Sequence, residues 1–251
     1  MNAMPLVSVI TVCLNAEKTI RRTIESVIGQ SYSSIEYIIV DGGSTDATMS
    51  IIKEYGDRIA KAISEKDSGI GDAFNKGINV STGVYLQFIN ADDILQPQKI
   101  EYSVRVLQEN PDAAFVFGDI IKINEKGDGV RISGDPLYAR SISYVMNRVN
   151  HPTMMVKRSL FAHYGLFDPQ WRIAMDYDWI LRIHRSGLKG VYSSDIVVQT
   201  QSGGISDAQR FRAFRECRDI SIHHGKNRIF AYCYYGMRIL KHLILKTVGA
   251  R

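Results

Sequence analysis

Cysteine is scarce in this sequence, with three residues among 251, and no two of them form a C-x-x-C pair. Three cysteines cannot build a disulfide framework, and their spacing does not indicate a zinc site. We therefore expect a reducing, cytoplasmic environment. Proline is also rare, with six residues, and a composition of 45% hydrophobic and 23% charged residues excludes a disordered or collagen-like chain.

Long apolar runs and phosphate-loop motifs are missing as well. No stretch reaches the roughly 18 uncharged apolar residues that a membrane-crossing helix needs, and we expect no signal peptide at the N-terminus. The absence of G-x-x-x-x-G-K-[ST] argues against a P-loop NTPase, and the absence of G-x-G-x-x-G argues against a dinucleotide site. A chain of this length can bury a full core, so we expect one α/β domain.

Positive charge gathers at the C-terminal end. Residues 210–251 contain ten Lys or Arg and two acidic residues, a net charge of +8, and the remaining residues carry −3. We expect no nucleic-acid partner, because such a partner calls for basic groups spread over the fold. Residues 226–251 have six Lys or Arg, no acid and an apolar side, which fits an anionic membrane surface. Packing of this helix on the body or on another subunit is the alternative.

The first 110 residues alternate between strand and helix patterns. Apolar, mostly β-branched residues predict four buried strands, at 6–13, 35–40, 59–64 and 84–89. Amphipathic helices are predicted between the strands, the first at about 16–30, and another carries Ile100, Val104 and Leu107. This order predicts an α/β fold with a mostly parallel central sheet flanked by helices.

Beyond residue 112 the alternation is weaker. A strand is predicted at 114–123, followed by a hairpin turn at Gly127-Asp128-Gly129. Helices near 158–164 and 176–187 and a strand near 191–198 come next. We find no internal repeat and no linker, so we expect one domain with a C-terminal helical appendage.

Acidic residues follow three of the predicted strands. Asp41, Asp67 and the pair Asp92-Asp93 each lie just past a strand's carboxyl end. Ligands of open α/β sheets bind along that edge, although Asp is also a common turn residue. Two adjacent carboxylates repel one another unless a cation offsets their charge. We therefore expect Mg²⁺ or Mn²⁺ at Asp92 and Asp93, with a nucleoside diphosphate completing its shell.

The turn after the second strand reads Asp41-Gly42-Gly43-Ser44-Thr45-Asp46. Its glycines predict a turn, and Ser44 or Thr45 can cap the helix that follows. For Asp46 we prefer a turn or capping role to a ligand contact.

Four segments then follow one another in a recognisable order. They are VSVITVCLNAEKTI, IEYIIVDGGSTDAT, SEKDSGIGDAFNKGINVSTGVYLQFINADD and HPTMMVKRSLFAHYGLFDPQWRIAMDYDWILR. In this order they resemble the inverting family 2 glycosyltransferases with the GT-A fold, and the resemblance extends over roughly residues 6–206. Bacterial transferases that build surface polysaccharides look most similar.

The resemblance implies a metal-dependent, inverting transfer of a sugar from a nucleoside-diphosphate sugar, with UDP as the expected carrier. The implied acceptor is a saccharide or a lipid-linked molecule in polysaccharide or lipopolysaccharide biosynthesis. Residues 1–206 would form the GT-A domain, with a Rossmann-like nucleotide-sugar half at about 1–110 and an acceptor half at about 111–206. Residues 207–251 would form basic amphipathic helices, and the protein would be cytoplasmic and peripheral at the inner face of the cell membrane.

The resemblance also assigns roles to individual residues. The implied nucleotide-binding residues are Thr11, Cys13, Asn15, Asp41, Asp67, Asp72, Lys76 and Asp92. The implied metal ligands are Asp92 and Asp93, and the implied general base is Asp176. Three positions depart from the family pattern: Asn90 replaces the first Asp of D-x-D, Leu14 replaces a frequent aromatic residue, and Met175 replaces a frequent acid.

Asp176 opens the helix predicted at 176–187, so it is either a general base or a helix cap. The helix N-terminus would lower its pKa, whereas enclosure by Trp171, Tyr177 and Trp179 would raise it. We expect Asp178, two residues further on, to be structural.

The expected residues on the acceptor or phosphate side are His151, Trp171, Gly204 and Ser206. His151 precedes a proline, so we expect it to be extended, either as a ligand or as a plain loop histidine. Trp171 is either a packing residue or a sugar platform. Residues 203–206 form either a loop over the diphosphate or an ordinary turn.

Two rival functions stay open. A catalytically silent nucleotide-sugar-binding or scaffolding protein would keep the loops at the strand ends but would not need Asp92 and Asp176 to act together. A nucleotidyltransferase would have a similar sheet but usually requires a basic, glycine-rich phosphate-binding loop early in the chain. Residues 11–22 do not contain a clear loop of this kind.

Overall fold

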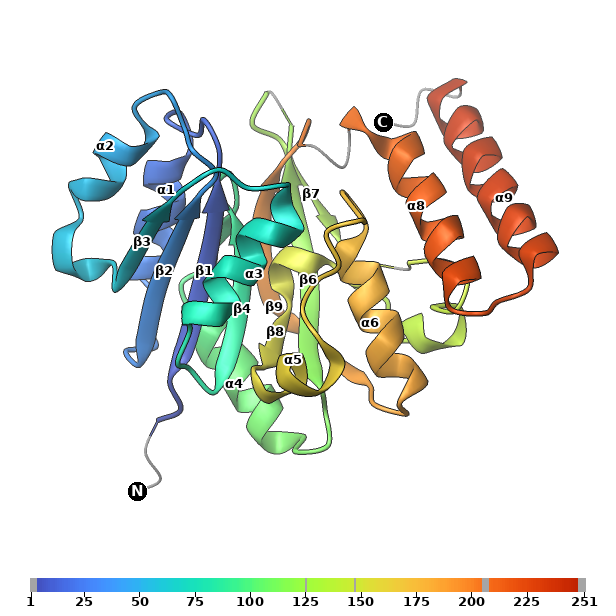
Figure 1. Cartoon of the computed structure of the whole chain (residues 1–251), viewed down its shortest axis with the longest axis horizontal. Coiled ribbons are helices and arrows are strands. Elements are labelled where there is room, and N and C mark those ends of the chain that lie inside the picture. Colours follow the sequence, from blue (N-terminus) through green and yellow to red (C-terminus); the bar gives the residue numbers. More distant parts are fainter. Residues whose placement is uncertain (1–3, 125, 147, 205–207, 248–251) are drawn as a thin grey trace.

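One mixed β-sheet runs through the centre of the molecule (Figure 1). The computed structural model describes residues 4–124, 126–146, 148–204 and 208–247. Within these residues, nine strands form the sheet in the order β3-β2-β1-β4-β8-β6-β9-β5, and β7 pairs with β6. The strands are β1 Val7–Cys13, β2 Ile35–Asp41, β3 Lys61–Ser64, β4 Tyr85–Asn90, β5 Ile94–Leu95, β6 Phe115–Ile123, β7 Gly129–Ile132, β8 Met155–Lys157 and β9 Gly190–Gln201.

Helices cover both faces of this sheet, as expected from the alternating pattern. They are α1 Ile20–Ile28, α2 Thr48–Lys53, α3 Ile70–Val80, α4 Lys99–Glu109, α5 Ser159–Tyr164, α6 Met175–Arg185, α8 Arg210–His223 and α9 Arg228–Thr247. Three short 3-10 helices are η1 Gly56–Arg58, η2 Tyr138–Arg140 and η3 His151–Thr153. The predicted α/β class with a helical C-terminal part is confirmed.

The first four predicted strands are confirmed, and they pair in parallel. β1 lies between β2 and β4, and β3 continues beyond β2. The register sets Cys13 opposite Asp41 and Asp41 opposite Ser64, while Val12 lies opposite Asn90. The carboxyl ends of these strands, and the loops that follow them, therefore meet at one edge of the sheet.

Antiparallel strands complete the sheet on the side of β4. β8 pairs antiparallel with both β4 and β6, and β9 runs parallel to β6. The predicted hairpin is confirmed, because β6 and β7 pair from Ile123 and Gly129 onward. The strands β5 and β8 have two and three residues, too few to leave a periodic pattern in the sequence.

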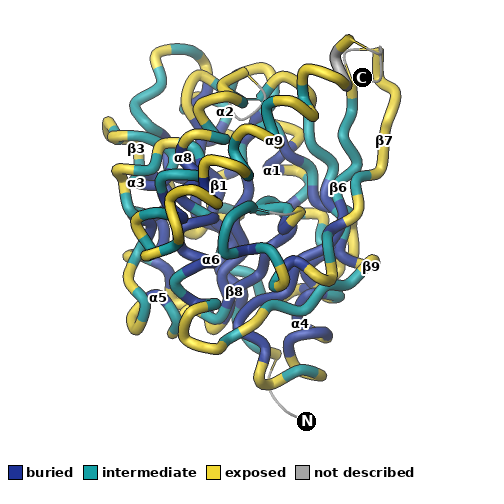
Figure 2. The backbone as a smooth tube through the Cα atoms, turned by 90° about the vertical axis from the view of Figure 1, so that its right-hand side faces the viewer, coloured by how far each residue is buried: buried dark blue, intermediate teal, exposed yellow. Residues whose placement is uncertain are grey.

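The two faces of the sheet carry separate apolar clusters. Ile10 belongs to the cluster under α3 and α6, whereas its neighbour Val9 belongs to the cluster under α1 and α4. Successive side chains of a strand point to opposite faces, so a continuous apolar run such as β1 serves both clusters. Figure 2 shows the buried residues gathered along the strands of the sheet, with exposed residues on the outer helices.

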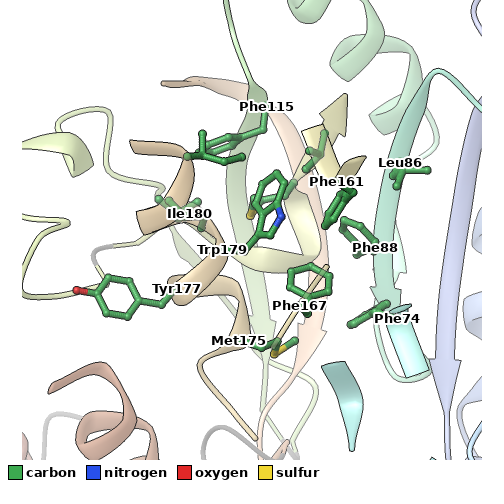
Figure 3. Packing of buried hydrophobic residues seen from close by; sticks show 14 of the residues in the cluster. Phe74, Leu86, Phe88, Phe115, Phe161, Phe167, Met175, Tyr177, Trp179 and Ile180 are labelled. Atoms are coloured by element: carbon green, nitrogen blue, oxygen red, sulfur yellow. The ribbon is translucent and has the colours of Figure 1, made fainter. Parts of the chain in front are cut away.

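An aromatic group joins the two halves of the chain (Figure 3). Phe161 of α5 stacks on Trp179 of α6 with ring centroids 4.5 Å apart, and Phe88 of β4 meets Phe161 at 5.8 Å. Phe74 of α3 lies 5.2 Å from Phe88. Each buried aromatic side chain of this size contributes about 1.5–3 kcal/mol, so the group holds α6 firmly against the parallel part of the sheet.

Helices α8 and α9 lie side by side beyond α6 (Figure 1). α8 packs on α6, where the Tyr177 and Ser221 hydroxyls are 2.9 Å apart. α9 stacks Tyr234 on Tyr144, with ring centroids 5.3 Å apart. The predicted tail helix is thus present and one side of it touches the body. In the described part of the chain, none of the helices has the length and hydrophobicity that a membrane crossing requires.

The turn after β2 corrects one expectation and confirms another. Neither Ser44 nor Thr45 caps α2, because that helix begins three residues after Thr45 and the Ser44 hydroxyl donates to Asp41 instead. The Asp46 carboxylate accepts the Thr48 backbone N–H at 3.0 Å, which gives Asp46 the structural role that was expected.

A lysine side chain is enclosed in the core. Lys99 is fully buried, and its Nζ donates to the side-chain oxygen of Gln87. In the described part of the chain it forms no ion pair. Burial lowers the pKa of Lys99 well below its usual range, because a cation is poorly solvated in the interior.

This burial predicts a specific pH dependence of stability. Between the lowered pKa of folded Lys99 and about 10.4, the unfolded chain binds one more proton at this residue than the folded protein. The free energy of unfolding should therefore rise by about 1.4 kcal/mol per pH unit relative to Lys99→Met in this range. Urea unfolding of both proteins at pH 7, 8 and 9 measures this difference.

The matched control for this measurement is Lys53→Met, which changes an exposed lysine on α2. Its stability should follow the wild-type pH dependence. If the curves of wild type and Lys99→Met run parallel from pH 7 to 9, Lys99 is charged in the folded state and the prediction is wrong.

Candidate active site

The carboxylate of Asp41 organises the edge of the sheet at the end of β2. Asp41 is fully buried, and its Oδ2 accepts the Ser64 hydroxyl at 2.7 Å and the Ser44 backbone N–H at 3.0 Å. Burial works to raise the pKa of Asp41, but these hydrogen bonds outweigh it and hold the pKa below its ordinary value. Asp41 is therefore an ionised residue that accepts hydrogen bonds from its own turn and from Ser64, and its contact with a nucleotide base stays a prediction.

Cys13 and Asn15 tie the end of β1 to the same turn. The Cys13 thiol lies 3.7 Å from Asp41 Oδ1, and burial together with the Asp41 charge raises the pKa of the thiol. Asn15, with φ of 49°, accepts the Thr45 backbone N–H at 2.9 Å through its side chain. Both residues lie at the predicted edge.

Thr11 lies further inside the sheet than expected. Its side chain is fully buried, and its hydroxyl lies 3.0 Å from the Tyr37 hydroxyl. Residue 11 is two positions before the end of β1, so its side chain stays in the interior. This geometry gives Thr11 a structural contact and leaves the predicted nucleotide contact without support.

The loop after β3 folds against the turn after β2. Asp67 Oδ1 accepts the Gly69 backbone N–H at 2.9 Å, and a Cβ atom on Gly42 would lie 2.3 Å from Asp67 Oδ2. A side chain at position 42 would therefore displace the Asp67 carboxylate from this position. The base of the loop is held by Asp72, which accepts the Ser68 N–H at 2.9 Å, and by Lys76, which donates to the Lys66 carbonyl at 2.7 Å.

The structure separates the roles of the Asp92-Asp93 pair. Asp93 is 3% exposed, and its Oδ2 accepts the Asn90 side-chain and backbone N–H groups at 3.0 and 3.3 Å. Burial and the charge of Asp92 raise the pKa of Asp93 to about 8. Burial also raises the pKa of Asp92, which is only partly buried and whose carboxylate has no hydrogen-bonding side chain among the described residues.

These two carboxylates suit a divalent ion that takes its other ligands from a substrate. Within the described ranges neither one forms an ion pair, and no group of three or more His, Cys, Asp or Glu side chains gathers to form an all-protein metal cage. Mg²⁺ and similar ions are commonly held by one or two carboxylates together with phosphate oxygens and water. Burial raises both pKa values, and a cation bound beside these carboxylates would lower them by favouring the charged forms.

Gly204 lies beside Asp92, since a Cβ atom on Gly204 would be 3.9 Å from Asp92 Oδ2. The segment after β9 therefore reaches the same edge of the sheet as the strand-end loops. Ser206 lies outside the described residues, and the choice between a loop over the diphosphate and an ordinary turn stays open.

Asp176 lies in the first turn of α6 and is partly buried. Burial raises its pKa to about 6, the Tyr177 N–H opposes the rise, and the nearby charge of Glu216 adds to it. A carboxylate with a pKa near 6 is ionised at neutral pH and still basic enough to accept a proton in a reaction. At this helix terminus, burial therefore outweighs the opposing backbone hydrogen bonds, while enclosure by Trp171, Tyr177 and Trp179 stays a prediction.

The C-terminal helix α8 holds the start of α6 in place. Glu216 Oε2 accepts the backbone N–H groups of Ile173 and Ala174 at 2.8 and 3.0 Å. These N–H groups at the helix start have no partner within the helix, so Glu216 acts as a cap supplied from another helix. The sequence analysis missed Glu216, because a lone acid in a basic helix carries no pattern that points to a residue 42 positions away.

Asp178 is structural, as expected. It is 3% exposed and pairs with Arg182 at 3.1 Å and with His224 at 2.8 Å. These contacts tie α6 to the end of α8.

His151 corrects an expectation about its backbone. It begins the 3-10 helix η3 and is not extended, because the carbonyls of Asn150 and His151 accept the N–H groups of Thr153 and Met154 and close a tight turn. Its ring stacks on Phe88 at 5.7 Å, and burial lowers its pKa to about 4. A neutral imidazole in this aromatic group supplies no positive charge to a phosphate.

Trp171 is half-buried and packs on the core cluster under α6. Its indole N–H is buried and has no hydrogen-bond partner in the described chain. The packing role is therefore present, while contact with a sugar stays a prediction.

The loop that carries Asp67 touches the segment that leads to Asp176. Arg172 donates from Nη1 to the Ser68 carbonyl at 2.6 Å, and a Cβ atom on Gly71 would lie 3.5 Å from the Met175 side chain. Groups from the parallel half of the sheet and the candidate base are thus held next to one another.

A family model described as glycosyl transferase family 2 matches residues 8–165. An uncharacterized glycosyltransferase of Rickettsia prowazekii is 31% identical over 190 residues, which cover 72% of this chain and 59% of that protein. A PGL/p-HBAD biosynthesis glycosyltransferase of Mycobacterium bovis is 26% identical over 213 residues, covering 82% of this chain and 80% of that protein. In four of its curated relatives, including the Rickettsia prowazekii protein, this chain spans 32 to 66% of the relative's own length.

Two solved structures have a similar fold. The mannosyltransferase PcManGT of Pyrobaculum calidifontis, solved with GDP-Man and Mn²⁺, gives a TM-score of 0.69 at 19% identity over 93% of this chain and 70% of that one. TarS 1–349 of S. aureus, solved with UDP, gives 0.66 at 17% identity over 94% of this chain and 71% of that one.

The cap from Glu216 predicts a measurable loss of stability. Glu216→Ala leaves two N–H groups at the start of α6 without an acceptor, which should lower the free energy of unfolding by about 2 kcal/mol. Chemical denaturation measures it. Asp219→Ala, which removes an acid 40% exposed on the same helix, is the control and should cost less than about 0.5 kcal/mol. Equal losses for the two variants would contradict the cap.

Proposed function

Since the chain belongs to glycosyl transferase family 2 and has a fold of the GT-A type, we propose that it transfers a sugar from a nucleoside-diphosphate sugar to an acceptor hydroxyl with inversion. We assign the donor half to about residues 1–110 and the acceptor half to about 111–206. Residues 207–251 then form the basic helical part that supports the acceptor half.

The observation that carries this proposal is the contact between the donor-side loops and the start of α6. The bond from Arg172 to the Ser68 carbonyl holds Asp67 and Asp176 on neighbouring segments of one edge. A binding protein would need the loops alone. The partly buried carboxylate with a pKa of about 6 on the neighbouring helix is what a transferase adds.

In the proposed reaction, the acceptor oxygen forms a bond to the anomeric carbon as the bond from that carbon to the phosphate oxygen breaks. Asp176 accepts the proton of the acceptor hydroxyl, and the nucleoside diphosphate leaves. Glu216 holds the backbone before Asp176 and so orients its carboxylate. A single displacement of this kind inverts the configuration at the anomeric carbon.

We propose a bound Mn²⁺ or Mg²⁺ whose protein ligand is Asp92, with Asp93 closing the turn behind it. Such an ion would screen the charge on the leaving diphosphate. Support comes from the raised pKa values of both carboxylates and from the PcManGT structure with Mn²⁺. The donor is proposed to be UDP- or GDP-linked, as in the solved TarS and PcManGT complexes, and the base would lie near Cys13, Asn15 and Asp41.

The acceptor is proposed to be a saccharide or a lipid-linked molecule of a polysaccharide pathway, with the protein at the inner face of the membrane. In support, α9 exposes large apolar side chains, among them Ile229 at 73% and Leu240 at 59%. Basic groups on the same helix suit an anionic lipid surface.

Asp176→Asn tests the proposed base. The variant cannot accept the proton, so transfer should fall by about 10²- to 10⁴-fold, while UDP or GDP binding with Mn²⁺ stays near the wild-type affinity. In the wild type, kcat/KM should rise with pH through about 6, because the reactive form is the ionised carboxylate. Transfer assays with a panel of UDP- and GDP-sugars and calorimetry with the nucleotides give these quantities.

Glu216→Gln is the companion variant, because it keeps a hydrogen-bond acceptor but removes the charge. Its rise in kcat/KM should lie at lower pH than in the wild type, since the charge of Glu216 raises the pKa of Asp176. If Asp176→Asn transfers sugar as fast as the wild type, Asp176 is not the general base. If the wild type binds nucleotides but transfers no sugar from any donor tested, a catalytically silent binding protein is favoured.

Asp92→Asn tests the metal ligand. UDP or GDP should raise the melting temperature of the wild type more with Mn²⁺ than with EDTA, because binding to the folded state stabilises it. Asp92→Asn should lose most of this metal dependence, whereas Asp93→Asn should keep it. If Mn²⁺ makes no difference to any of the three proteins, the proposed metal site does not exist.

A further inference from the structure

A large cavity lies between the C-terminal helices and the body, away from the strand-end loops. It is lined by side chains of α8 and α9 and by Asp135, Val145, Met146 and Arg148, and its volume is about 740 Å³. Four cationic side chains line it, Arg148, Arg210, Arg238 and Lys241, against one carboxylate, that of Asp135. No residue assigned above to the donor, metal or base is part of this lining, so the cavity is a separate site.

The cationic groups converge from three separate elements of the chain. Arg148 comes from the segment before η3, Arg210 opens α8, and Arg238 and Lys241 lie one turn apart on α9. Like charges repel, and bringing them to one cavity raises the free energy of the protein unless an anion sits among them. Across the described residues, the Arg148 and Lys241 side chains form no ion pair.

Arg238 is partly buried and packs on an aromatic ring. Its guanidinium lies over the ring of Phe214, 4.2 Å from the centroid, and its Nη1 is buried without a hydrogen-bond acceptor within the described residues. Burying an N–H group without an acceptor raises the free energy of the protein, and more so when the group is charged. The ring holds the guanidinium flat, so its remaining donors are oriented before any ligand arrives.

Arg210 is oriented as well, since its Nη1 lies 3.2 Å from His242 Nδ1. Planar guanidinium groups held in place bind phosphate oxygens through paired, charge-assisted hydrogen bonds. We propose that this cavity binds a phosphate or diphosphate group, through Arg148, Arg210, Arg238 and Lys241.

The apolar part of the lining agrees with a phosphate carried on a larger molecule. Val145, Met146 and Phe214 form part of the wall. Phe211 and Leu240, on the two helices that border the cavity, are 46% and 59% exposed. The phosphate group comes either free in solution or as the head group of a lipid, and the two sources need separate measurements.

The site lies on the helix that also caps α6. α8 presents Arg210 and Phe214 to the cavity, while Glu216 bonds to the backbone before Asp176. A phosphate bound here would be held on the acceptor side of the protein. The binding itself does not depend on sugar transfer, so a failure of the proposed activity leaves this inference standing.

Two titrations of the full chain test the site. The first uses sodium pyrophosphate in EDTA, followed by calorimetry, so that a metal-dependent donor site does not contribute. The second uses vesicles of phosphatidic acid in phosphatidylcholine, with pure phosphatidylcholine as the neutral reference, followed by co-sedimentation. The wild type should bind pyrophosphate, the phosphatidic acid vesicles, or both.

The variants Arg148→Gln and Lys241→Gln change exposed side chains and should melt at the wild-type temperature. Each should weaken binding about tenfold or more, as expected for the loss of one charge-assisted hydrogen bond. Arg215→Gln, an exposed arginine of α8 outside the cavity, is the matched control and should bind like the wild type.

Loss of pyrophosphate binding in the two variants supports a site for the phosphate group itself. Loss of vesicle binding alone supports the same site and identifies a lipid head group as the source. Absence of binding to both probes, or equal weakening by Arg215→Gln, overturns the proposal.

Discussion

A carboxylate that is buried away from water must be hydrogen-bonded, protonated or paired with a cation. Three acidic residues near the carboxyl edge of this sheet, Asp41, Asp93 and Asp176, meet this requirement to different degrees. Asp41 is ionised because its own turn and Ser64 donate to it. Asp93 accepts two N–H groups of Asn90, and burial still raises its pKa to about 8. The pKa of Asp176, about 6, lies between the pKa values of Asp41 and Asp93. The loops and the helix start at this edge therefore hold an ionised carboxylate, a carboxyl group whose pKa is raised to about 8 and a carboxylate whose pKa is about 6.

These three groups come together because the two halves of the chain share one sheet and one core. β8 joins the parallel strands to β6, and the stacked rings of Phe161 and Trp179 press α6 against β4. Helix α8 then holds α6 from outside, because its Glu216 accepts the backbone N–H of Ile173 before α6 and His224, just after α8, bonds to Asp178. Helix α8 is thus a structural part of the candidate active site and also lines the basic cavity.

The parallel strands, the strand-end acids and the helix opening near Asp176 could all be predicted, because each leaves a local signal in the sequence. Continuous runs of β-branched residues indicate buried strands. An acidic residue directly after such a run therefore lies in the loop that follows the strand. The roles of residues that contact partners far away in the sequence could not be predicted in this way. Thr11 points inward to Tyr37, and His151 stacks on Phe88, contacts that no local spacing indicates.

The sequence by itself determined the α/β order, the edge at which the acids gather and the concentration of positive charge after residue 209, because periodicity and composition are properties of neighbouring residues. Only the tertiary structure decided that the pKa of Asp41 is lowered and that of Asp93 is raised, since a pKa depends on burial and on hydrogen-bond donors brought from elsewhere in the chain. For the same reason, the cap from Glu216 and the cavity lined by Arg148, Arg210, Arg238 and Lys241 became visible only when segments far apart in the chain were placed side by side.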